Sequence, residues 1–270
     1  MDIKSRKIEM KVKKFTVAVF VAGIVFGAVG TTLVGGIFGD KEKGQKAEEP
    51  VKVVEVEKEA TPRVEEKVVD SLEVAQHNAE KLASDEWELT LVNRFYPLAK
   101  SYAPEIVEVE SGKYVDKRIL ADLQEMLADA RKEGLQPFIC SAYRDFEYQR
   151  QVFNDTMVTW IAQGYTPLES YEETAKSVAI PGTSEHATGL ALDITSAAFA
   201  ELDDRQADTP EAKWLAENCW KYGFILRYPL DKSDVTGIVF EPWHYRYVGK
   251  EYAKEITEKG LTLEEFVGKN

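Results

Sequence analysis

The sequence predicts an α+β domain with a central, largely antiparallel sheet flanked by helices, preceded by a transmembrane helix and a charged stalk. Three observations favour this organisation. Helix-like and strand-like segments are mixed along residues 86–270 without strict strand–helix–strand alternation. Residues 39–85 are rich in Glu, Lys and Val and contain no aromatic residue, which is typical of a stalk or linker. Residues 15–38 form an uncharged, apolar run.

The N-terminal residues predict export. Residues 1–14 carry six Lys and Arg residues, and the apolar run of residues 15–38 exceeds the roughly 20 residues that span a bilayer. Because basic residues precede the run, we expect a cytoplasmic N-terminus and a single-pass signal anchor in the cell membrane. The remainder of the chain would then lie outside the cytoplasm. A signal peptide cleaved near Ala28-Val29-Gly30, giving a secreted form, is the alternative.

The second half of the stalk has apolar residues at helical spacing, which predicts a helix there. These positions are Val64, Val68, Leu72, Ala75, Ala79 and Leu82. A solvated linker is the alternative. The net charge of the chain is −13, so it lacks the basic surface of nucleic-acid-binding proteins, and we expect no nucleic-acid partner. Cys140 and Cys219 are explained equally well as small buried residues, so no disulfide is predicted.

Periodicity and capping signals predict the remaining elements in chain order. Helices are expected at residues 117–134 and 145–164, from their apolar faces. Thr209 and Pro210 begin a further helix that Gly223 ends, and Thr262 with Glu265 forms the capping box of a short terminal helix. Strands are expected at residues 137–143, 188–195, 224–228, 237–240 and 243–248.

Only two of the three histidines belong to the predicted domain, and the first is His186. In the strand that follows it, Leu190, Leu192 and Ile194 alternate with smaller residues and Asp193. One face of this strand would enter the core, and the other would carry the carboxylate of Asp193. Seven positions separate His186 from Asp193, so the chain must bend between them, and Gly189 is suited to that bend.

The second histidine, His244, follows Glu241 and Pro242. Because proline interrupts a regular ladder, Glu241 and His244 are expected to face one point from either side of a turn. Two histidines and one aspartate supply the three protein ligands of a catalytic zinc site with an open position for water. Glu241 then remains as general base for that water and as proton donor to the leaving group.

A third segment, Ser141 to Arg144 followed by Gln149, lies where a predicted strand gives way to a helix. The planar guanidinium of Arg144 is suited to hold a substrate carboxylate or a developing oxyanion. An ordinary surface ion pair is the alternative role for Arg144.

These three segments, in this order, resemble the VanY-type D-alanyl-D-alanine carboxypeptidases over about residues 87–268. The resemblance implies the hedgehog/D-Ala-D-Ala peptidase fold and one zinc ion. It implies His186, Asp193 and His244 as zinc ligands and Glu241 as the catalytic base. It also implies that Arg144 contacts the substrate, with Gln149 and Ser184 as further substrate-binding residues.

The function implied is zinc-dependent removal of the terminal D-Ala from peptidoglycan stem peptides or precursors. Two enzymatic alternatives use the same site, namely an L,D-carboxypeptidase and a peptidoglycan endopeptidase. A non-catalytic zinc-containing wall-binding module is the alternative from another class. The presence of Glu241 argues against that module, because a purely structural zinc site needs no base.

Overall fold

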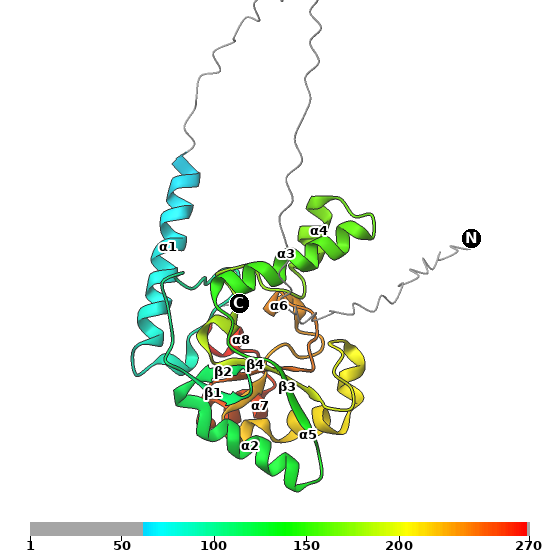
Figure 1. Cartoon of the computed structure of the whole chain (residues 1–270). Helices are drawn as coiled ribbons and strands as arrows, with labels where there is room; N and C mark the ends of the chain where they lie inside the picture. Colours follow the sequence, from blue (N-terminus) through cyan, green and yellow to red (C-terminus); the bar gives the residue numbers. More distant parts are fainter. Residues whose placement is uncertain (1–61, 269–270) are drawn as a thin grey trace, which may run out of the picture.

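The computed structural model describes residues 62–268, with side chains from residue 71 onward (Figure 1). The strands are β1 Ile106–Glu110, β2 Lys113–Asp116, β3 Pro137–Ser141, β4 Ala191–Ser196, β5 Phe224–Leu226 and β6 His244–Tyr247. The α-helices are α1 Pro62–Leu82, α2 Leu120–Lys132, α3 Phe146–Ala162, α4 Pro167–Thr174, α5 Pro210–Asn218, α6 Ser233–Thr236, α7 Lys250–Lys259 and α8 Leu263–Phe266. Single 3₁₀ turns include η2 Lys117–Ile119, η3 Glu185–Thr188 and η5 Cys219–Tyr222.

The central sheet has the strand order β3-β4-β6-β5, and every neighbouring pair is antiparallel. One face carries Leu192, Ile194 and Tyr245, which are fully buried in the main core together with apolar residues of α2 and α5. The opposite face carries Asp193 and His244, which lie directly across from each other on β4 and β6. The predicted α+β class with an antiparallel sheet flanked by helices is therefore confirmed.

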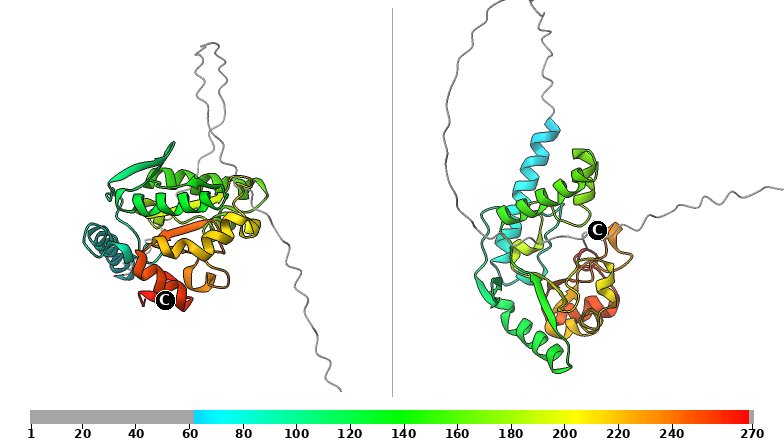
Figure 2. Two further views of the ribbon diagram at one scale, coloured as in Figure 1. Left: turned by 90° about the horizontal axis from the view of Figure 1, so that it is seen from below. Right: turned by 45° about the vertical axis from the view of Figure 1, so that its right-hand side comes forward.

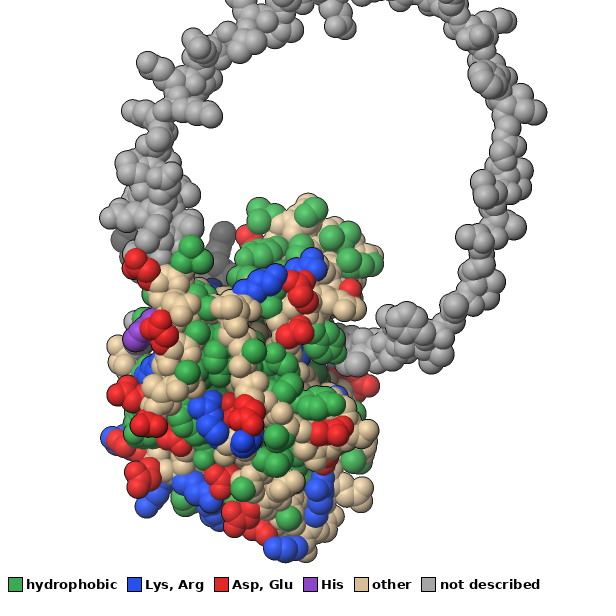
Figure 3. All heavy atoms as spheres, turned by 60° about the vertical axis from the view of Figure 1, so that its left-hand side comes forward, with side chains coloured by type: hydrophobic (Ala, Val, Ile, Leu, Met, Phe, Trp, Pro, Cys, Tyr) green, Lys and Arg blue, Asp and Glu red, His purple; other side chains and the backbone are tan. Residues whose placement is uncertain are grey.

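The end of α1 is docked on the domain. Leu82 lies in the main core, and the Asn78 side-chain amide donates to the backbone oxygens of Leu91, Tyr96 and Pro97. Figure 2 keeps α1 on one flank of the molecule, away from α5. The face in Figure 3 mixes acidic and basic side chains and shows no continuous basic patch.

The prediction of a strand at residues 237–240 is wrong. Gly237, at φ +75°, ends the one-turn helix α6, and the backbone then runs irregularly toward Pro242. The β1–β2 hairpin and the helices α4, α6 and α7 were not predicted. The β1–β2 hairpin turns at Gly112, and α4 begins with Pro167 behind a capping box of Thr166 and Glu169.

The predicted membrane segments lie outside the described residues. They are residues 1–14, the anchor of residues 15–38 and the start of the stalk, and they remain predictions. Among residues 62–268, no helix is both long and apolar enough to cross a bilayer. Cys140 and Cys219 are free thiols.

Candidate metal centre

Three sequence-distant elements bring the predicted zinc ligands together. Antiparallel pairing of β4 with β6 places Asp193 opposite His244 on the same face of the sheet. His186 reaches that face from η3, because Gly189 adopts φ +74° directly after the turn and redirects the chain into β4. A β-carbon at Gly189 would lie 2.8 Å from the backbone nitrogen of Asp116, so only glycine fits this bend. The predicted bend is confirmed.

The ligand atoms converge around one point. His186 Nε2 lies 3.4 Å from Asp193 Oδ2, and His244 Nδ1 lies 3.1 Å from Asp193 Oδ1. The two imidazole rings are perpendicular, with centroids 5.0 Å apart. One ligand atom from each of the three residues lies within 4.8 Å of the others, and all three residues are buried.

The site has the properties of a metal centre rather than of a hydrogen-bonded cluster. His186 Nδ1 donates to the Ala142 carbonyl oxygen at 2.7 Å, which leaves the lone pair of Nε2 directed at Asp193. His186 Nε2 and Asp193 Oδ1 are buried without a hydrogen-bond partner among the described residues. Two imidazole nitrogens and one carboxylate oxygen are a donor set that zinc prefers. These residues therefore fit a zinc ion.

Burial and charge set the protonation of the ligands. Burial and the nearby Arg144 lower the pKa of His186 to about 4. Burial opposes ionisation of Asp193, yet the two histidines hold the pKa of its carboxyl well below the ordinary value. For His244, burial would lower the pKa, but the carboxylates of Asp193 and Glu185 raise it to about 9. A cation entering the site must therefore displace a proton from His244.

Glu241 lies beside the metal ligands, as expected from the turn between Glu241 and His244. Its Oε2 is 3.6 Å from His244 Nδ1, and the His244 backbone N–H donates to the Glu241 carbonyl oxygen across the turn. Burial first, and then the charge of Asp193, raises the pKa of Glu241 to about 8. A divalent cation beside the carboxyl would lower that pKa again.

The structure brings Arg144 to the centre, whereas Gln149 and Ser184 are buried in the elements that lead to it and stay predictions as substrate-binding residues. Arg144 Nη2 is 3.8 Å from Asp193 Oδ2, and the Arg144 backbone N–H donates to the His186 carbonyl oxygen. Gln149 is buried in α3, and its amide donates to the Ala179 carbonyl oxygen at 2.7 Å, while its Oε1 has no partner among the described residues. Ser184 is buried directly before η3.

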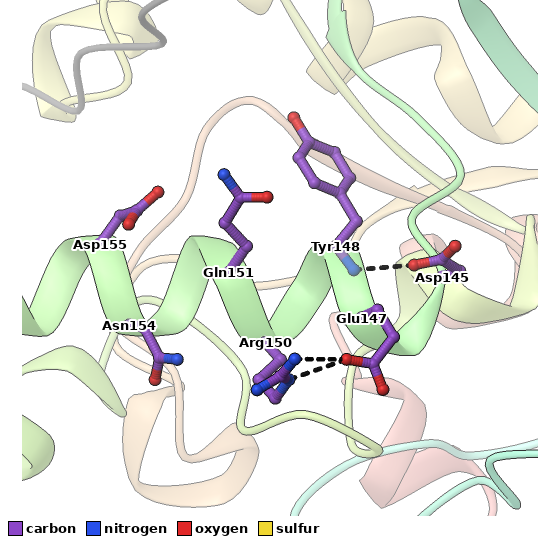
Figure 4. Close-up of a pocket in the computed structure, with 7 residues that line it drawn as sticks. All are labelled: Asp145, Glu147, Tyr148, Arg150, Gln151, Asn154 and Asp155. Atoms are coloured by element: carbon purple, nitrogen blue, oxygen red, sulfur yellow. Dashed lines mark hydrogen bonds and ion pairs between the residues drawn. The ribbon is translucent and has the colours of Figure 1, made fainter. Parts of the chain in front are cut away.

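A surface hollow follows Arg144 along the exposed side of α3 (Figure 4). Its lining residues are Asp145, Glu147, Tyr148, Arg150, Gln151, Asn154 and Asp155. None of the predicted site residues lines this hollow, and Asp145 serves α3 by accepting from the Tyr148 backbone N–H. The chemistry therefore belongs to the centre on the sheet and not to this hollow.

Sequence reasoning missed the residues that surround His244. The Tyr228 ring packs against the His244 ring at 4.8 Å between centroids. Glu185, Arg227 and Arg246 form a buried ionic cluster on the far side of His244 from Asp193. One signal was available, since Arg246 follows His244 by two strand positions and so shares its face of the sheet.

Comparison with known proteins agrees with this geometry. Residues 112–250 match the family model described as VanY: D-alanyl-D-alanine carboxypeptidase. A D-alanyl-D-alanine carboxypeptidase of Enterococcus faecalis is 41% identical over 182 residues, which cover 67% of this chain and 66% of that relative. The chain belongs to the VanY family.

Solved structures show the same similarity. The vancomycin resistance D,D-pentapeptidase VanY, crystallised as a mutant with Zn(II), aligns with a TM-score of 0.62 and 40% identity, covering 67% of this chain and 99% of that one. The LD-carboxypeptidase LdcB aligns with a TM-score of 0.59 and 35% identity, covering 69% of this chain and 92% of that one. These comparisons confirm the predicted family, the zinc cofactor and the enzyme class, that of metal-dependent carboxypeptidases.

Proposed function

We propose that the protein is a zinc-dependent D-alanyl-D-alanine carboxypeptidase that removes the terminal D-Ala from peptidoglycan stem peptides or their precursors. The observation that carries this proposal is the convergence of His186, Asp193 and His244 within 4.8 Å, with the Glu241 carboxyl beside them. Similarity to a D-alanyl-D-alanine carboxypeptidase and to a D,D-pentapeptidase supports the choice of substrate.

His186, Asp193 and His244 would hold the metal ion. When bound, zinc supplies a Lewis acid that polarises a carbonyl group and makes water acidic. Glu241 takes the proton from the attacking water and delivers it to the leaving amine of the terminal D-Ala. The buried position of Glu241 keeps bulk solvent away from that proton.

Arg144 supplies the positive charge on the substrate side. Its side chain is 14% exposed, and its Nε is buried without a hydrogen-bond partner among the described residues. Arg144 donates to the carbonyl oxygen of the scissile bond, where negative charge develops. Gln149, whose Oε1 is buried without a partner among the described residues, and Ser184 are the further substrate-binding residues in this proposal.

The site operates outside the cytoplasm in this proposal, because residues 15–38 anchor the chain in the cell membrane and residues 39–85 extend the domain toward the wall. The basic residues before the apolar run and the acidic sequence after it support this orientation. Protease protection of the full-length chain in intact cells, compared with lysed cells, tests it.

The direct test is incubation of the purified full-length chain and zinc with a stem pentapeptide ending in D-Ala-D-Ala, read by mass spectrometry. The expected product has lost one alanine. A tetrapeptide ending in a single D-Ala is the matched substrate for L,D-carboxypeptidase activity, and a cross-linked dimer tests endopeptidase action. No cleavage of the pentapeptide would refute the proposal, and preferential cleavage of either other substrate would reassign the specificity.

A further inference from the structure

Four charged side chains form a closed ionic cluster behind His244. Glu185 of η3, Arg227, Arg246 of β6 and Glu264 of α8 are each at most 1% exposed. Arg227 pairs with Glu264 through two hydrogen bonds of 2.6 and 2.8 Å. None of the four is among the residues predicted to bind zinc or substrate. Because burying charges is costly unless each is paired, such a cluster calls for a specific reason.

The two carboxylate oxygens of Glu185 differ in their hydrogen-bond partners. Oε1 accepts from Arg227 Nε at 2.9 Å and from Arg246 Nη1 at 3.0 Å. Oε2 is buried and has no hydrogen-bond partner among the described residues. Both arginines thus hold the carboxylate by one oxygen and leave the other directed elsewhere.

The unpaired oxygen faces an unpaired nitrogen. His244 Nε2 is buried and also lacks a partner in the described part of the chain, and it lies 3.8 Å from Glu185 Oε2. The other nitrogen of the same ring, Nδ1, faces Asp193 at 3.1 Å. The ring of His244 therefore stands between the metal centre on one side and Glu185 on the other.

We propose that Glu185 is a positioning residue that accepts the Nε2–H of His244, and so keeps the lone pair of Nδ1 directed at the zinc ion. The inference rests on the proposed function, since it takes His244 as a zinc ligand. A metal-bound imidazole commonly donates its second N–H to a carboxylate, which fixes both the tautomer and the orientation of the ring.

Arg227 and Arg246 hold Glu185, and Glu264 holds Arg227 in turn. Arg246 lies on the same strand as His244, and the Arg227 backbone N–H donates to the His244 carbonyl oxygen. Glu264 holds Arg227 from the C-terminal helix α8, and it also accepts from the Asn93 side chain. Helix α8 thereby supports the metal centre although it contributes no ligand. His244 Nε2 and Glu185 Oε2 lie 3.8 Å apart, so the proposed hydrogen bond requires the two side chains to approach each other.

The test compares Glu185→Gln with Glu264→Gln in the full-length chain. Both variants remove a buried carboxylate that pairs with Arg227, but only the first removes the acceptor that faces His244. A glutamine that keeps its oxygen on the arginines must turn its NH₂ toward the Nε2–H, and two donors then oppose each other. We expect zinc affinity, measured by competition with a chelator, to fall about 10–100-fold in Glu185→Gln and far less in Glu264→Gln.

Equal losses in the two variants would show that Glu185 acts only through folding, and no loss in Glu185→Gln would also overturn the proposal. If Glu185→Gln fails to fold, the wild type decides the question. In the zinc-loaded wild type, ¹⁵N NMR of the ring nitrogens of His244 is expected to show a protonated, hydrogen-bonded Nε2 and a metal-bound Nδ1. A metal-bound Nε2 would contradict the proposal.

These readouts separate this inference from the proposed function. Neither measurement uses peptide turnover. A wild-type chain that binds no zinc would remove the metal centre itself. A chain that binds zinc and cleaves the pentapeptide, yet shows a metal-bound His244 Nε2, would remove the role of Glu185 alone.

Discussion

Two buried charged clusters meet at His244, and they differ in how completely their charges are paired. On one side, Asp193, Glu241 and His186 present carboxylates and nitrogens with few partners. On the other side, Glu185 and Glu264 are balanced by Arg227 and Arg246 at hydrogen-bond distance.

The difference identifies what each cluster is for. An unpaired buried carboxylate is unstable in its charged form, and the raised pKa of Glu241, about 8, expresses that cost. The Glu185 carboxyl is equally buried, yet its arginines hold its pKa well below the ordinary value. The first cluster therefore has the unpaired buried donor atoms that fit a cation, and the second supplies a fixed frame. The comparison leads to four predictions, from the largest expected effect to the smallest.

The largest effect is expected from Glu241→Gln, in the cluster of Asp193, Glu241 and His186. Because the variant loses the group that moves the proton but keeps all three ligands, turnover should fall about 10²–10⁴-fold while one zinc ion per chain is retained. Mass spectrometry of the pentapeptide product gives the rate, and metal analysis gives the occupancy. Persistent turnover at the wild-type rate would show that Glu241 is not the base.

In the cluster of Glu185, Arg227, Arg246 and Glu264, Arg227→Met should lower the stability of the fold. The variant leaves Glu185 and Glu264 as buried carboxylates short of a partner, so the free energy of unfolding should fall by about 3–5 kcal/mol. The control is metal-free Glu241→Gln. This variant removes a buried carboxyl from the cluster of Asp193, Glu241 and His186 and should not destabilise the fold. Denaturant unfolding of both metal-free variants gives the two free energies of unfolding. Equal losses in the two variants would contradict the distinction between the two clusters.

The bend that joins the two clusters is sensitive to a single methyl group. Gly189→Ala should destabilise the fold by about 1–3 kcal/mol, because the position has φ +74° and the new β-carbon would lie 2.8 Å from the backbone nitrogen of Asp116. Gly134→Ala is the matched control, since Gly134 has φ +86° but nothing within 4 Å of a β-carbon. Equal changes in the midpoint of thermal unfolding would show that the close contact does not matter.

The smallest effect concerns pH. In the metal-free protein, the pKa of His244 is about 9 and that of His186 is about 4. Below about pH 8, zinc must displace the proton of His244 and also that of Glu241, whose pKa the cation lowers, so affinity should fall by at most about tenfold per pH unit for each proton displaced. His186 is already neutral at pH 6–8 and adds no such dependence. Titration calorimetry in buffers of different ionisation enthalpy counts the protons released, and a count of zero at pH 7 would contradict the assignment.

The sequence predicted the metal centre better than it predicted the fold around it. His186, Asp193 and His244 could be grouped because each histidine lies next to a carboxylate in an otherwise apolar segment, and the alternation of Leu192 with Asp193 fixed which side chain leaves the core. The bend at Gly189 followed from the odd spacing alone. These are local signals, and the structure agrees with them.

The contacts around this centre could not be predicted from the sequence. Residues 237–240 have apolar side chains but gain no strand partner, so the expected strand is absent. The pairing of Arg227 with Glu185 and Glu264 joins residues 42 and 37 positions apart, and no local pattern indicates such a pair. Glu185 in particular reads as an ordinary polar neighbour of His186 until the arginines are in place.

The central claim is that His186, Asp193 and His244 bind one zinc ion, and anomalous X-ray diffraction from zinc-loaded crystals of the full-length chain tests it most directly. We expect a single zinc peak in contact with His186 Nε2, a carboxylate oxygen of Asp193 and His244 Nδ1. A peak at any other position, or full loading without a peak between these three side chains, would contradict the account.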